Sequence, residues 1–196
     1  TLGSGGAWQW YSGSCGGTFV GTGISVSVSP SSTTTYYVRA EGTCNTTSCV
    51  SLIITVNSLS TAPTSATATV NPLCQGNSTT LTAVGGVLGS GANWQWYSGS
   101  CGGTAAGSGL TLSVTPASTT TYYVRGEGTC NTTSCVSITI TVNTNSTPPT
   151  SITATVNPTC PSQATTLTVV GGSLGSGANW QWYSGSCGGT FVGSGI

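Results

Sequence analysis

Apolar and polar residues alternate along short stretches of this chain, and clusters of Gly, Pro, Asn and Ser separate one stretch from the next. A period of two is typical of half-buried β-strands, and the longer period of an amphipathic helix is missing. The pattern therefore predicts an all-β fold. In the middle of the chain we expect seven strands, at Ser65–Val70, Thr79–Val84, Asn93–Tyr97, Thr104–Ala106, Leu110–Thr115, Thr120–Arg125 and Cys135–Val142.

The same alternation predicts the core, because side chains two apart on a strand point to the same face. The residues expected to point inward and fill one core are Leu81, Ala83, Trp94, Trp96, Leu110, Leu112, Val114, Tyr122, Val124, Val136, Ile138, Ile140 and Val142. The expected outward set is Gln95, Tyr97, Tyr123, Arg125 and Glu127, together with rows of Ser and Thr.

The chain is built from tandem copies of one unit. The run WQWYSGSCGGT begins at Trp8, Trp94 and Trp180, which gives a period of 86 residues, and several other motifs recur at the same offset. A unit of this size with seven short strands is typical of one immunoglobulin-like β-sandwich. We predict the back part of a first domain at residues 1–58, a complete domain at 59–145 and the front part of a third at 146–196.

Both ends of the sequence fall inside a repeat. We therefore expect the chain to be a window on a longer repeat polymer, with any signal peptide or sorting signal outside it. Apolar runs near the 18 residues that a spanning helix needs are missing from the sequence, so we expect no membrane span in this segment.

Charge is nearly absent, which excludes most chemistry. Apart from Cys and Tyr, the ionisable side chains are Arg39, Glu41, Arg125 and Glu127, and the sequence has no Lys, Asp, His or Met. Nucleophilic catalysis lacks a base, paired-carboxylate hydrolysis lacks a second acid in each repeat, and Ca²⁺ or Mg²⁺ lacks clustered carboxylates. Two Arg balanced by two Glu provide no basic surface for nucleic acid. We predict a protein that is not an enzyme and needs no cofactor.

The order of the motifs resembles a known type of repeat. Trp-Tyr, Gly-Gly-Thr, Thr-Thr-Thr-Tyr-Tyr-Val and Cys-Val-Ser before a Thr/Ile/Val strand are similar to the bacterial immunoglobulin-like repeats of large secreted surface proteins, and the similarity covers the whole chain. The resemblance implies an architectural role in an adhesin or cell-surface protein more than any one ligand. It also places Val124 where antibody domains carry the second core cysteine, so Ala83 and Val124 take the place of that disulfide under Trp96.

Nine cysteines in a Ser/Thr/Gly/Val-rich sequence indicate an oxidising extracellular compartment. Zinc at the Cys-x4-Cys pairs is the weaker interpretation, because these thiols would be oxidised there. In a seven-strand sandwich we expect the turns that carry Cys74 and Cys101 at one end and the hairpin that carries Cys130 and Cys135 at the other, too far apart to be bridged. The favoured disulfides are Cys74–Cys101, Cys130–Cys135, Cys44–Cys49 and Cys160–Cys187, with Cys15 unpaired. The alternative is Cys74–Cys135 with Cys101–Cys130, in a distorted topology or between repeats or chains.

Two kinds of surface site are hypotheses at this point. One is a contact face made of Tyr97, Tyr123 and Arg125 and of their repeats Tyr11, Tyr37 and Arg39. Its aromatic rings could cover one another as cross-strand pairs, pack against a neighbouring chain or stack on a sugar, and Arg125 and Glu127 are expected to form a weak surface ion pair. The other is glycosylation, at the sequons that begin at Asn45, Asn77, Asn131 and Asn145 or on Ser and Thr.

These observations predict a structural component of an extracellular filament or stalk, whose partners are copies of itself. The alternative is an array of binding modules, an adhesin that presents a carbohydrate- or protein-binding face and has glycans among its partners. Short loops rich in Gly, Ser and Thr favour the structural interpretation, because loops that discriminate ligands are more specialised. The linker dipeptide Pro148-Pro149 predicts semi-rigid connections between domains.

Overall fold

The computed structural model describes residues 2–195, and all of the regular structure in this range is β-strand. Across these residues there is no helix long and apolar enough to cross a membrane. The chain divides into two compact units. Unit 1 comprises Thr1–Thr61, Leu88–Ala92 and Gly128–Thr132, and unit 2 comprises Ala62–Val87, Asn93–Glu127 and Thr133–Ile196.

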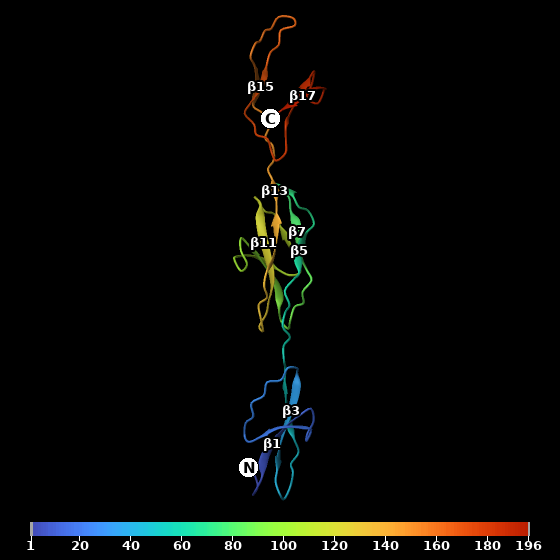
Figure 1. Cartoon of the computed structure of the whole chain (residues 1–196), viewed down its shortest axis with the longest axis vertical. Helices are drawn as coiled ribbons and strands as arrows, with labels where there is room; N and C mark the ends of the chain where they lie inside the picture. Colours follow the sequence, from blue (N-terminus) through green and yellow to red (C-terminus); the bar gives the residue numbers. More distant parts are fainter. Residues whose placement is uncertain (1, 196) are drawn as a thin grey trace. The chain divides into compact units, whose positions relative to one another are not determined.

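The second repeat is built on two antiparallel sheets. One sheet has the order β10 (Thr111–Val114), β7 (Thr79–Val84), β5 (Ser65–Ala68), and the other has the order β12 (Val136–Ile140), β11 (Thr120–Glu127), β8 (Asn93–Ser98), β9 (Thr104–Ser108). β5 lies beside β12 and β10 beside β9, so the two sheets form the two layers of a sandwich (Figure 1). A short parallel pair, β6 (Leu73–Cys74) with β13 (Val142–Asn143), was not expected from the sequence.

The core of the second repeat lies between these two layers. Its largest fully buried side chains are Trp96, Leu81, Ile140 and Val124, and Ala83, Trp94 and Tyr122 are also buried. These inward assignments from the alternation are confirmed. Leu110 is the exception, because it is 58% exposed in the turn after Gly109, just before β10 begins. Leu73, which lies in the unexpected strand β6, belongs to the core and is 2% exposed.

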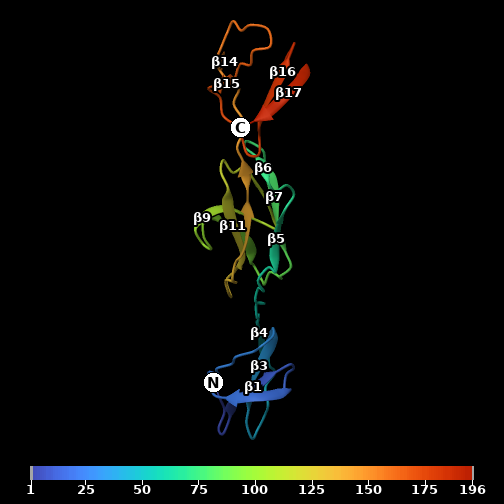
Figure 2. The same ribbon diagram turned by 45° about the horizontal axis from the view of Figure 1, so that its top comes forward.

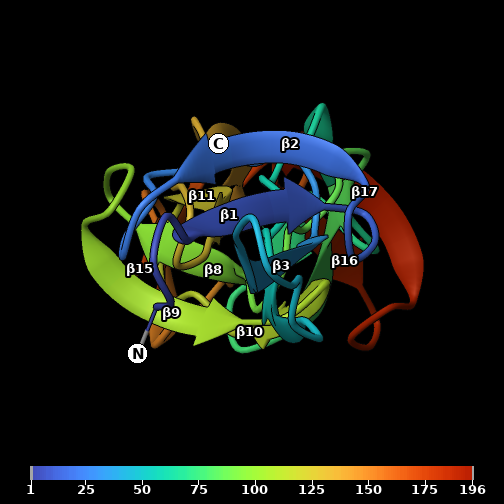
Figure 3. The same ribbon diagram turned by 90° about the horizontal axis from the view of Figure 1, so that it is seen from below.

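The described residues of the first repeat form the equivalent of the β12-β11-β8-β9 sheet. Its strands are β1 (Ala7–Ser12), β2 (Thr18–Thr22), β3 (Thr34–Glu41) and β4 (Val50–Ile54), in the order β2-β1-β3-β4. Figure 3 shows β1 and β2 side by side in this sheet. Val50 and Leu52 are 70% and 63% exposed in this sheet. Their equivalents in the second repeat, Val136 and Ile138, are half-buried.

The third repeat consists of two separate strand pairs. β14 (Ser151–Ala154) pairs with β15 (Leu167–Val170), and β16 (Trp180–Ser184) pairs with β17 (Thr190–Gly195), as Figure 2 shows. Leu167, the equivalent of the fully buried Leu81, is 47% exposed. Within residues 2–195 the complete sandwich is therefore that of the second repeat, and the expected all-β immunoglobulin-like fold is confirmed there strand by strand, with ends that differ by a few residues.

Candidate functional site

The charged residues of the second repeat form one compact cluster on the outer face of the β8–β11 sheet. Arg125 donates from Nε to Glu127 Oε1 over 2.7 Å, and its Nη2 lies 2.6 Å from the same oxygen. The Tyr97 hydroxyl also donates to Glu127 Oε1, over 2.6 Å. The Arg125 guanidinium lies over the Tyr97 ring, with Cζ 5.1 Å from the ring centroid. The expected ion pair is confirmed, and the tyrosine extends it.

This arrangement shifts the pKa values of its members. The hydrogen bond from Tyr97 and, after it, the one from Arg125 lower the pKa of Glu127, while burial opposes them. The hydrogen bond to the Glu127 carboxylate raises the pKa of Tyr97, and burial adds to that increase. The carboxylate, the guanidinium and the phenol therefore satisfy one another, so the cluster offers neither a free charge nor a free base.

The first repeat carries the same cluster, made by Tyr11, Arg39 and Glu41. The Tyr11 hydroxyl and Arg39 Nε both donate to Glu41 Oε1, and Arg39 lies 5.1 Å from the centroid of the Tyr11 ring. Phe19 adds an edge-on ring contact to Tyr11 at 6.1 Å. Tyr37 lies opposite Tyr11 in register, as Tyr123 lies opposite Tyr97. The predicted contact face is thus brought together twice, with its Arg and Glu used internally.

A disulfide ties the loop after β8 across this cluster. Cys101 is bonded to Cys135, with 6.0 Å between their Cα atoms, and Cys15 is bonded to Cys49 in the first repeat, with 5.9 Å. Arg125 Nη1 lies 3.6 Å from Cys101 Sγ, so the loop passes directly over the guanidinium. The disulfide is therefore a clip over the outer face of one sheet.

This pairing corrects the one favoured from the sequence. Cys74–Cys101, Cys130–Cys135, Cys44–Cys49 and Cys160–Cys187 are not formed, and neither is the alternative of Cys74–Cys135 with Cys101–Cys130; Cys15, expected to be unpaired, is bonded. The error lay in placing the loop after β8 at the end of the sandwich. The loop instead turns back along the sheet, helped by Gly99 and Gly102 with φ of 83° and 75°. Cys44, Cys74, Cys130, Cys160 and Cys187 are free and exposed.

A second site receives the linker that precedes the second repeat, and it lies within unit 1. We call it the linker socket; it is formed by the loop 88–92 and the hairpin tip 128–132. Two hydrogen bonds join Asn131 and Ser60. Ser60 N donates to Asn131 Oδ1 and Asn131 Nδ2 donates to Ser60 O, both over 2.9 Å. Gly89 N donates to Ser60 Oγ over 2.9 Å, and Ser58 N donates to Ser90 Oγ over 3.0 Å. Ser60 is only 6% exposed.

The socket needs glycine at its base. A Cβ on Gly89 would lie 2.7 Å from the carbonyl carbon of Leu59 and 2.8 Å from Ser60 N, which is closer than real Cβ contacts. The third repeat repeats this arrangement within unit 2. There Thr144 N donates to Ser176 Oγ over 3.0 Å, and Gly175 N donates to Ser146 Oγ over 2.9 Å. Each linker is therefore seated by the same backbone and hydroxyl contacts.

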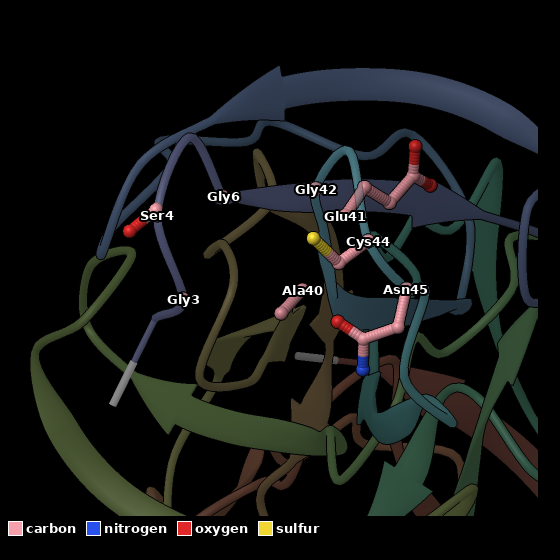
Figure 4. Close-up of a pocket in the computed structure, with 8 residues that line it drawn as sticks. All are labelled: Gly3, Ser4, Gly6, Ala40, Glu41, Gly42, Cys44 and Asn45. Atoms are coloured by element: carbon pink, nitrogen blue, oxygen red, sulfur yellow. The ribbon is translucent and has the colours of Figure 1, made fainter.

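In the described part of the first repeat, the equivalent loops surround a hollow, here called the open socket. A hollow of about 220 Å³ is lined by Gly3, Ser4, Gly6, Ala40, Glu41, Gly42, Cys44 and Asn45, and a Cβ on Gly3 would meet nothing within 4 Å. In Figure 4 the Cys44 thiol points into this hollow, whereas the Glu41 carboxylate points away from it. Gly3, Ser4 and Asn45 are the equivalents of Gly89, Ser90 and Asn131.

Asn45 and Asn131 both begin sequons, and the sequence pattern does not connect either of them with the linker. In the structure the Asn131 amide is occupied by Ser60, while Asn45, Asn77 and Asn145 are exposed. A signal was present, because Ser60 recurs as Ser146 and Asn131 recurs as Asn45 with the same 86-residue period. Hydrogen bonds across 71 residues leave no trace in local alternation, however, so the pattern alone could not pair them.

A comparison with protein families gives a match over most of the chain. The family described as Ig-like domain, CHU_C associated, matches residues 1–57 and 61–143. No curated protein matches the chain. Among solved structures, a chain described as "Biofilm associated protein - BSP domain" is 14% identical, with a TM-score of 0.26, and the match covers 71% of this chain and 26% of that one. This chain thus spans about a quarter of the length of that chain.

Proposed function

The chain belongs to the CHU_C-associated family of bacterial immunoglobulin-like domains, and from this premise we propose that it is a structural, non-enzymatic segment of an extracellular surface protein, in which each linker is seated in a socket of the following repeat. The observation that carries the proposal is the seating of Ser60 by Asn131 and Gly89. A seated linker restricts the connection between repeats, as a spacer or stalk requires.

Two further features support a structural role over a ligand-binding one. In the first and second repeats the Arg and Glu side chains bind one another inside the clusters, and Arg125 lies over the Tyr97 ring. The aromatic face therefore has few polar groups left with which to recognise a sugar. The Cys101–Cys135 disulfide reinforces the fold and fits an oxidising extracellular site. An adhesive role for the array would then depend on partners other than this face.

Amide hydrogen exchange tests the proposal. In the intact chain the Ser60 amide should exchange at least about tenfold more slowly than in the Asn131→Ala variant, because a hydrogen-bonded amide exchanges only when its partner releases it. The matched control is Asn45→Ala, which makes the same change in the open socket and should leave the Ser60 amide unaffected. A Ser60 amide that exchanges in the intact chain as fast as in Asn131→Ala would contradict a seated linker.

A further inference from the structure

We infer that the disulfide clip of the second repeat is a thiol–disulfide exchange site whose two sulfurs have different roles. In the reduced clip, Cys101 is the reactive thiolate and attacks an external disulfide of low molecular weight. Cys135 then resolves the mixed disulfide and closes the clip. Arg125 makes the two sulfurs different, because its guanidinium lies against Cys101 Sγ. The inference goes beyond the proposed function, and the linker socket has no part in it.

Arg125 directs one donor group at the sulfur of Cys101. Its Nε and Nη2 lie 2.7 and 2.6 Å from Glu127 Oε1, so the carboxylate occupies one edge of the guanidinium. Nη1 lies outside that edge, 3.6 Å from Cys101 Sγ. A guanidinium keeps its proton at every ordinary pH. A permanent positive donor therefore faces Cys101, and such a donor stabilises a thiolate.

The loop that carries Cys101 is held by more than the disulfide. Gly99 N donates to Thr121 O over 3.1 Å at the start of the loop. Gly102 lies flat against the guanidinium, since a Cβ built there would be 3.1 Å from Arg125 Nη2. These contacts do not involve sulfur. Cys101 therefore stays beside Arg125 when the sulfur–sulfur bond is broken.

Access points to the same sulfur. Cys101 is exposed in the loop after β8, whereas Cys135 is half-buried just before β12. Within residues 2–195, the hydrogen bond to a sulfur of this clip is the one that Arg125 donates to Cys101. Thiol–disulfide exchange depends on the thiolate fraction of the attacking sulfur and on its access to the target. Cys101 meets both conditions better than Cys135.

The first repeat contains the same arrangement. Arg39 Nε donates to Glu41 Oε1 over 2.7 Å, and Arg39 Nη1 lies 3.8 Å from Cys15 Sγ. A Cβ built on Gly16 would be 3.1 Å from Nη1. Cys15 is exposed and Cys49 is half-buried. The first cysteine of each clip is therefore the one that faces the guanidinium, and the same roles apply to Cys15 and Cys49.

The other titratable groups on this face leave the effect of Arg125 in place. They are Glu127 on β11 and the phenols of Tyr97 and Tyr123. A phenol is uncharged at neutral pH, and the hydrogen bond to Glu127 raises the pKa of Tyr97 further. Glu127 is negative, but its Oε1 accepts hydrogen bonds from Arg125 and Tyr97. The charged group in contact with Cys101 is therefore the guanidinium.

The closing reaction has two steps. The Cys101 thiolate attacks one sulfur of the external disulfide R–S–S–R, a bond forms between Cys101 Sγ and that sulfur, and R–S⁻ leaves. The Cys135 thiolate then attacks Cys101 Sγ, the clip closes and a second R–S⁻ leaves. The two protein thiols lose two electrons and two protons, and the external disulfide becomes two thiols. An external thiol reopens the clip by the reverse steps.

Single-thiol forms of the second clip test the inference. Cys135→Ser leaves Cys101 free, and Cys101→Ser leaves Cys135 free. Both are reacted with 2-hydroxyethyl disulfide, a neutral reagent, and the adduct is followed by mass spectrometry. We expect Cys101 to react at least about threefold faster at neutral pH, with its rate–pH curve centred at lower pH than that of Cys135. The two rates should become equal in urea. Both variants are made in a chain whose free cysteines are replaced by Ser, at Cys44, Cys74, Cys130, Cys160 and Cys187.

Two further substitutions in the Cys135→Ser chain separate the charge of Arg125 from the integrity of its cluster. Arg125→Gln should lower the Cys101 rate to that of Cys135. Glu127→Gln removes the carboxylate but keeps the guanidinium, so it should raise the Cys101 rate.

Three results would overturn the inference. They are equal rates for the two sulfurs in the folded chain, a faster Cys135, and an unchanged Cys101 rate in Arg125→Gln. A Glu127→Gln rate as low as that of Arg125→Gln would also overturn it, because the loop would then depend on the intact cluster and not on the charge. The seated linker of the proposed function is tested separately by the Ser60 amide.

Discussion

The first and second repeats contain nearly the same residues in the same sheet and differ in what covers that sheet. Trp96, Val124 and Ile140 are completely buried, whereas the equivalent face of the first repeat leaves Val50 70% and Leu52 63% exposed. Strand pairing is nevertheless the same, with Trp10 opposite Val38 as Trp96 is opposite Val124. The comparison shows that pairing along the chain forms the sheet, while burial of the core requires the second layer.

The largest expected effect comes from the tryptophan at the centre of that core. Trp96→Ala should lower the free energy of unfolding of the second repeat by about 3–5 kcal/mol, since a fully buried ring leaves a cavity. Trp10→Ala, made at the same position of the half-buried face, should cost the first repeat clearly less. Urea unfolding followed by the amide signals of each repeat measures both. Equal losses of unfolding free energy in the two variants would contradict the difference in burial between the two repeats.

Removal of the disulfide should have the next largest effect. Cys101→Ser should destabilise the second repeat by about 2–4 kcal/mol, because the unfolded chain is no longer constrained between residues 34 apart. Cys15→Ser removes the equivalent bond from the first repeat and should act in the same direction. Thermal unfolding under non-reducing conditions measures both variants. Cys74→Ser is the control, and it should change the stability little, since Cys74 is free and exposed.

Trypsin distinguishes the disulfides of the structure from those favoured by the sequence. Arg39 and Arg125 are the only cleavage sites, so the unfolded, alkylated chain gives fragments 1–39, 40–125 and 126–196. Cys15–Cys49 and Cys101–Cys135 would join all three fragments until they are reduced. Cys74–Cys101, Cys130–Cys135 and the other favoured pairs lie within single fragments and would leave three separate peptides without reduction, a result that would contradict the structure.

The two sockets offer a smaller and sharper contrast. Gly89→Ala should displace the linker and destabilise its docking by about 1–3 kcal/mol, because the new Cβ would meet Leu59 and the hydrogen bonds to Ser60 would be lost. Gly3→Ala adds the same methyl group to the open socket and should change stability by less than about 0.5 kcal/mol. Urea unfolding and the Ser60 amide exchange rate measure the pair. A linker that stays protected in Gly89→Ala would contradict the socket geometry.

The smallest effect concerns pH, where we expect the two repeats to behave alike. The lowered pKa of Glu127 contributes stability above the ordinary value of 4.5, and this contribution is lost as pH falls through the lowered pKa. The raised pKa of Tyr97 contributes stability below 10.0, and this contribution is lost as pH rises through the raised pKa. Stability should therefore be flat between about pH 5 and 9 and fall on both sides. Glu127→Gln should flatten both decreases in the second repeat, as thermal unfolding across pH would show.

Alternation and period together predicted the layers of the second repeat because its strands are short and face one core. Leu81, Trp96 and Ile140 point inward as expected. Leu73 was missed, since a two-residue strand is too short to alternate, and Leu110 was misplaced because it lies in the turn before its strand.

The sites were harder to predict, because each depends on a loop that leaves its strand. Alternation does place Cys135 on the same outer face as Tyr123 and Arg125, and this was a usable signal for the clip. The path of Cys101 back over Arg125 depends on backbone turns at Gly99 and Gly102, which the alternation of neighbouring strands does not encode. The seating of Ser60 by Asn131 joins segments 71 residues apart and likewise lies outside local pattern.

The clip between Cys101 and Cys135 also limits how far one repeat can lengthen under a pulling force. When a repeat unravels, tension passes through the sulfur bridge and bypasses the 34-residue stretch that it closes. Of the 86 residues in one period, about 52 would then extend, which gives an extended length of roughly 180 Å at about 3.5 Å per residue. Reduction would release the remaining stretch, so single-molecule extension would show a longer step for each repeat. An array with its disulfides intact would thus lengthen by a short step for each repeat that unfolds, and the stretch between the two bonded cysteines would stay closed.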